Sequence, residues 1–118
     1  CAEEGLTRLI TQVAAVRDGL EQPRLRELLA GLVKALESLP RQVPPATLAE
    51  LLAELEEHTL AALWEALPPA EQAQLQAQLQ DALPPGVSLS EQAWRVALLR
   101  EVRERLGLPR LELTADGA

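Results

Sequence analysis

Apolar residues recur at helical spacing in five segments of the chain, and prolines or glycines separate these segments. Leucine, isoleucine and valine lie three or four positions apart in most of them, which is the pattern of an amphipathic helix. The fourth segment is the least amphipathic, because its leucines are flanked almost wholly by Gln and Ala. The predicted helices span residues 3–18, 23–40, 46–67, 70–83 and the stretch that begins after a serine cap at Ser88 or Ser90 and ends at Leu106.

Short connections that contain proline or glycine join the predicted helices. Successive helices with such connections favour antiparallel neighbours. We therefore predict an all-α fold, an up-and-down antiparallel bundle of four to five helices that forms a single domain over residues 1–109. Residues 110–118 are expected to form a C-terminal tail that is flexible unless it docks on the bundle.

The composition agrees with closely packed helices. The 118 residues are one domain's length, and they include no Phe, Tyr or Met, so the core depends on leucine and alanine. A net charge of −7 argues against nucleic-acid binding, which needs clustered Lys and Arg in excess. No apolar run approaches the roughly 20 residues that span a bilayer.

Catalytic motifs are missing from the sequence. It contains no glycine-rich phosphate loop, dinucleotide fingerprint or nucleophile elbow, and it has one His and one Cys. We therefore predict that the protein is not an enzyme, and we expect no cofactor, metal or small-molecule substrate. His58 lies one helical turn after Glu54, so a metal site that uses both, with two further ligands from elsewhere, is an alternative. We favour the simpler interpretation, a solvated polar face with a weak ion pair.

Arginines on the last predicted helix form the candidate docking surface. They alternate with Glu101 and Glu104, which is typical of a solvated face, but Arg is also enriched at protein interfaces. Arg110 follows beyond this helix. The two tryptophans are the only aromatic residues, and they are the first candidates for interface anchors if they are exposed. The candidate partner-binding residues are Arg95, Arg100, Arg103, Trp94 and Trp64.

Cys1 is the only cysteine and the first residue of the chain. Maturation of a bacterial lipoprotein leaves an acylated cysteine at this position, so we expect Cys1 to be a lipidation site and a membrane anchor. The expected location is then the extracytoplasmic face of a bacterial membrane, in the periplasm or the thylakoid lumen. If Cys1 is not the native first residue, a cytoplasmic location is the alternative.

Three short stretches of the chain carry a resemblance to a known family: Val13 to Leu20 with Leu25 and Leu28, Ser38 to Arg41 with Thr47 to Ala49, and Trp94, Ala97 and Leu98 with Leu108 and Pro109. They resemble the cyanobacterial PsbQ-like lipoproteins, the extrinsic Q subunit of photosystem II. Together they cover about half the chain, discontinuously. The chain lacks the tryptophan-containing segment of that family and the His-Gly-Pro-Leu-Gly-like stretch after its first helix. The resemblance implies a lipidated four-helix bundle without catalytic activity that stabilises the oxygen-evolving machinery.

These observations predict a lipid-anchored, non-catalytic helical-bundle subunit that docks on a membrane protein complex and stabilises it. Its partners are the subunits of that complex and, through Cys1, the membrane. The alternative is a cytoplasmic α-helical adaptor, assembly chaperone or regulator. In that case the leucine-rich face of the third helix serves self-association or recognition of a partner helix.

Overall fold

The computed structural model describes residues 2–113, and these residues form five α-helices without a strand. This confirms the all-α class. The second helix ends three residues earlier than Pro40, because a residue that precedes proline is disfavoured in the helical conformation. The helices are α1 (Ala2–Gly19), α2 (Pro23–Glu37), α3 (Pro45–Ala66), α4 (Pro69–Ala82) and α5 (Glu91–Leu106).

Proline and serine set the beginnings of the helices. α2, α3 and α4 each begin with a proline, whose fixed φ suits the first turn and whose missing N–H has no helical acceptor to lose. α5 begins after Ser90, whose hydroxyl oxygen accepts a hydrogen bond from the backbone nitrogen of Ala93 at 3.2 Å. Ser90 rather than Ser88 is therefore the cap. Gly107 ends α5 at φ 73°, a left-handed conformation that glycine adopts without strain.

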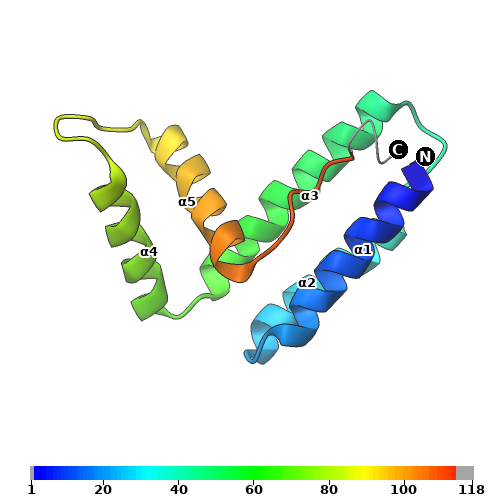
Figure 1. Cartoon of the computed structure of the whole chain (residues 1–118), viewed down its shortest axis with the longest axis horizontal. Helices are drawn as coiled ribbons and strands as arrows, with labels where there is room; N and C mark the ends of the chain where they lie inside the picture. The colour runs from blue at the N-terminus through cyan, green and yellow to red at the C-terminus, as the bar shows by residue number, and fades with distance from the viewer. Residues whose placement is uncertain (1, 114–118) are drawn as a thin grey trace.

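The helices form two arms that meet along α3 (Figure 1). α1 packs on α2 and α2 packs on α3, whereas α5 packs on α3 and α4 packs on α5. The α4–α5 pair diverges from the α1–α2 pair, so the molecule has an open V shape with extents of 46 × 32 × 20 Å. The described residues therefore do not form one core that all five helices share equally.

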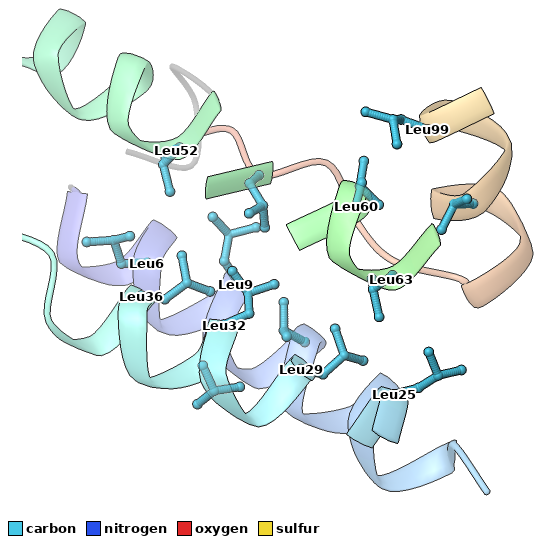
Figure 2. Close-up of a cluster of buried hydrophobic side chains, with 14 of the residues drawn as sticks. Leu6, Leu9, Leu25, Leu29, Leu32, Leu36, Leu52, Leu60, Leu63 and Leu99 are labelled. Carbon is cyan, nitrogen blue, oxygen red and sulfur yellow. The ribbon is translucent and has the colours of Figure 1, made fainter. Parts of the chain in front are cut away.

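Leucine side chains make the main core, which lies between α1, α2 and α3 and continues to α5 (Figure 2). Leu6, Leu29, Leu36, Leu52 and Leu63 are fully buried in it. α4 contributes only Leu75 to this cluster, since most of its remaining positions are exposed Gln and Ala. Its peripheral place agrees with its weak amphipathic pattern.

The chain after α5 returns along α3 as an extended segment, which we call the C-terminal strap (residues 108–113; Figure 1). Leu111 is only 6% exposed and belongs to the leucine core, and Leu113 packs partly against it. The tail expected from residue 110 is therefore docked over residues 110–113. The rest of that expectation, on residues 114–118, lies outside the described residues.

The open shape gives a prediction for solution scattering. The Cα radius of gyration is 15.5 Å, whereas a compact domain of this length has a value of about 13.5 Å. We expect small-angle X-ray scattering of the monomer to fit a curve calculated from the V-shaped chain with its hydration layer. A measured radius that fits the compact value would show instead that the two arms are closed in solution.

Candidate functional site

An open groove of about 810 Å³ lies between α3 and α5, and the C-terminal strap forms its third wall. We call it the α3–α5 groove. α3 lines it with Ala49 and Ala53, α5 with Val96, and the strap with Arg110 and Glu112. α5 and the strap follow each other in the sequence, but both lie far from α3, so the packing of α5 and the strap on α3 creates the groove.

The floor of the groove is apolar. Leu60, Leu99 and Leu111 line it, and all three belong to the buried core. Above them Val96 is 62% exposed, and the only other large apolar side chain that is exposed within residues 3–113 is Val87. Ala49 and Ala53 are exposed and four residues apart, so they lie on one face of α3. The α3–α5 groove thus presents apolar surface to solvent.

Arginines stand on the rim of the groove. Arg95 lies 4.0 Å from Glu57, and Arg100 lies 3.5 Å from Glu104 within α5. All four side chains are more than half exposed, so each pair is worth only about 0–1 kcal/mol. Arg110 is exposed and makes no ion pair with any residue that the structure describes. The positive charges of the rim are therefore accessible to a partner.

Arg103 differs from the other predicted docking arginines, because it is used inside the chain. Its side chain is 13% exposed, and its Nη1 donates to Oε1 of Glu56 at 3.0 Å. Oε2 of the same Glu56 carboxylate accepts a hydrogen bond from the backbone nitrogen of Leu111 at 2.6 Å. Glu56 therefore joins α3, α5 and the strap, and Arg103 stabilises the wall of the groove.

The two tryptophans do not share a surface with the rim arginines. Trp64 is half-buried against the core, and its carbonyl oxygen accepts a hydrogen bond from Nε2 of Gln72 at 2.6 Å, which fixes the corner between α3 and α4. Trp94 is half-buried one turn before Leu98 on α5. Neither is among the residues that line the α3–α5 groove. The structure thus places Arg95 and Arg100 at the α3–α5 groove and both tryptophans outside its lining.

The remaining sequence candidates lie outside this site. Cys1 is outside the described residues, so its lipidation stays a prediction. His58 is exposed on α3 and borders a shallow hollow with Glu54. The part of the chain that the structure describes contains no cluster of His, Cys, Asp and Glu able to hold a metal ion.

Within residues 2–113, no helix has the length and apolar content needed to cross a bilayer.

Sequence reasoning missed the residues that build the groove. Glu56 is separated by 47 residues from Arg103 and by 55 from Leu111, and no local pattern indicates such pairings. Leu111 had a usable signal, since two leucines separated by one glutamate follow Pro109 and alternation of this kind indicates one apolar face. Val96 is part of the apolar content of its helix in the sequence, but it faces solvent in the structure.

No protein-family description, curated protein or solved structure matches the chain significantly. The resemblance to PsbQ-like lipoproteins therefore stays a prediction that rests on its three short stretches.

Proposed function

We propose that this protein is a non-catalytic helical interaction module that binds a partner protein in the α3–α5 groove. The observation that carries the proposal is Val96, which is 62% exposed beside the buried leucines of the groove floor. Exposed apolar surface with a polar rim is typical of protein interaction sites. A groove between two helices suits the apolar face of a third helix.

The walls of the groove are fixed before a partner arrives. The ion pair between Glu56 and Arg103 joins α3 to α5, and the amide of Leu111 secures the strap to the same carboxylate. A preformed surface avoids the entropic cost of ordering its segments during association. These contacts support a preformed docking surface rather than one that forms on binding.

The proposal extends to the partner and to the order of the helices. A membrane protein complex as partner, in particular the oxygen-evolving side of photosystem II, follows from the PsbQ-like resemblance alone. The antiparallel, up-and-down order of successive helices is supported by the short connection at residues 20–22, which joins α1 to the helix α2 that packs on it.

Site-specific photo-cross-linking tests the docking surface. We would replace Val96 with p-benzoylphenylalanine in cells that make the protein and identify the adducts by mass spectrometry. Val87 offers a matched control, because it is the other exposed large apolar residue and is not among the groove-lining residues. We expect a defined partner to cross-link from position 96 and not from position 87.

A second variant shows whether the cross-linked protein is a true partner. Val96→Glu places a charge on the apolar surface and is expected to abolish co-purification of that protein, while the melting temperature stays within about 2 °C because the side chain is exposed. The same adducts from both positions, or undiminished co-purification with Val96→Glu, would contradict the proposal.

A further inference from the structure

We infer that the partner segment in the α3–α5 groove is an acidic amphipathic helix of another protein, an inference that rests on the proposed function. The chain as a whole carries a net charge of −7, yet the charged residues that line this groove are four arginines and three glutamates. Arg95, Arg100 and Arg110 are exposed there, against the exposed carboxylates of Glu57 and Glu112. The residues that line the groove thus have a net charge of +1, opposite in sign to the net charge of the chain.

The remaining carboxylate of the groove does not offset these arginines. Glu56 is 23% exposed, and both of its oxygens are engaged by Arg103 and by the amide of Leu111. Its charge is compensated within the chain by that of Arg103. The exposed lining therefore has three cationic and two anionic side chains. Glu57 is 4.0 Å from Arg95, and Glu104, which lies outside the lining, is 3.5 Å from Arg100. Arg110 makes no ion pair within the described residues, and the other two pairs are exposed and weak, so all three guanidinium groups can pair with incoming carboxylates.

The positions of the arginines match both edges of a bound helix. Arg95 and Arg100 belong to α5, on either side of Val96 in the sequence, while Arg110 belongs to the strap. A helix that places its apolar stripe on Val96, Ala49 and the leucines of the floor would point its flanking residues toward α5 on one edge and toward the strap on the other. Carboxylates at these flanking positions would meet guanidinium groups on both sides, and charge complementarity of this kind selects the partner.

The apolar stripe of the partner is expected to contain bulky residues where it meets α3. Ala49 and Ala53 are small and exposed, so a helix can approach the backbone of α3 closely or insert leucines above them. A partner of this class is an amphipathic helix with leucine and alanine on one face and glutamate or aspartate along both borders of that face.

Two synthetic peptides of about 20 residues, long enough to span roughly 30 Å as helices, test this inference. Both have the same leucine and alanine stripe, and the residues that border it are Glu in one peptide and Lys in the other. Fluorescence anisotropy with the full chain is expected to show at least about tenfold tighter binding of the Glu peptide. The Glu residues form several exposed ion pairs with the rim arginines, whereas the Lys residues of the other peptide are repelled by them. This preference is expected to weaken as salt is raised.

Charge-reversed variants test whether the groove arginines cause the preference for the Glu peptide. Combined Arg95→Glu, Arg100→Glu and Arg110→Glu substitutions are expected to abolish or reverse the preference for the Glu peptide. The matched control reverses Arg8, Arg24 and Arg26, which are exposed on α1 and α2 and make no ion pair within the described residues. This control is expected to keep a preference for the Glu peptide that the groove variant loses.

Several outcomes would overturn the inference, and they separate it from the proposed function. Equal binding of both peptides, binding of neither, or equal losses in the two charge-reversed variants would refute an acidic helix as the occupant. If cross-linking from position 96 still identifies a partner, the groove remains a docking surface for a segment of other chemistry. A concentration-dependent dimer that Val96→Glu dissociates would assign the groove to a second copy and would also refute the inference.

Discussion

Replacement of Leu63 by alanine is expected to lower the free energy of unfolding by about 2–5 kcal/mol. Leu63 is fully buried and belongs to the same core cluster as Leu25 and Leu29 of α2 (Figure 2). The substitution removes buried methyl groups and leaves a cavity, which an already close-packed leucine core fills only in part. Because domains are stable by only about 5–15 kcal/mol, this loss is a large share of the total.

Urea-induced unfolding followed by circular dichroism measures this effect. Val96→Ala is the matched control, because it shortens an apolar side chain that is 62% exposed, and it is expected to change stability by no more than about 0.5 kcal/mol. If the two substitutions had equal effects, Leu63 would not lie in a packed core in solution.

Glu56→Ala is expected to lower stability by about 2–3 kcal/mol, the second largest effect. The substitution leaves the guanidinium of Arg103 unpaired at 13% exposure and removes the acceptor of the Leu111 amide. Breaking one partner of a largely buried pair costs more than the pair itself contributes, because the remaining charge stays desolvated. The strap should also detach more often from α3.

Unfolding titrations and hydrogen exchange of the Leu111 amide test both parts of this expectation. Glu57→Ala offers the control, since Glu57 is adjacent in sequence but 68% exposed and 4.0 Å from Arg95. Its effect should stay within about 0.5 kcal/mol, and the Leu111 amide should exchange as in the unmodified chain. Unchanged exchange in Glu56→Ala would show that this carboxylate does not hold the strap.

The helices could be predicted because their signals are local. The spacing of leucines and the prolines that precede α2, α3 and α4 depend only on near neighbours in the sequence. The peripheral place of α4 also had a local cause, because a helix with only Leu75 and Leu79 buried has little apolar surface to share.

The groove could not be predicted, because it depends on how α5 crosses α3. Arg95, Arg100 and Arg103 look equivalent along the sequence, yet the crossing buries Arg103 against Glu56 and leaves the other two exposed. The same crossing leaves Val96 in solvent although its helical neighbour Leu99 is buried. Which of these side chains is buried depends on contacts between residues about 50 positions apart. A window short enough to show helical periodicity does not contain both partners of such a contact.

Methyl NMR spectroscopy of the full chain, titrated with the Glu-bordered peptide, tests the α3–α5 groove most directly. Ala49, Ala53 and Val96 line the groove, whereas Val13 and Val33 are buried in the core that α1 and α2 share with α3. We predict that the methyl resonances of Ala49, Ala53 and Val96 shift on binding while those of Val13 and Val33 stay in place. Shifts confined to Val13 and Val33, or no shift at Val96 at saturating peptide, would contradict the account.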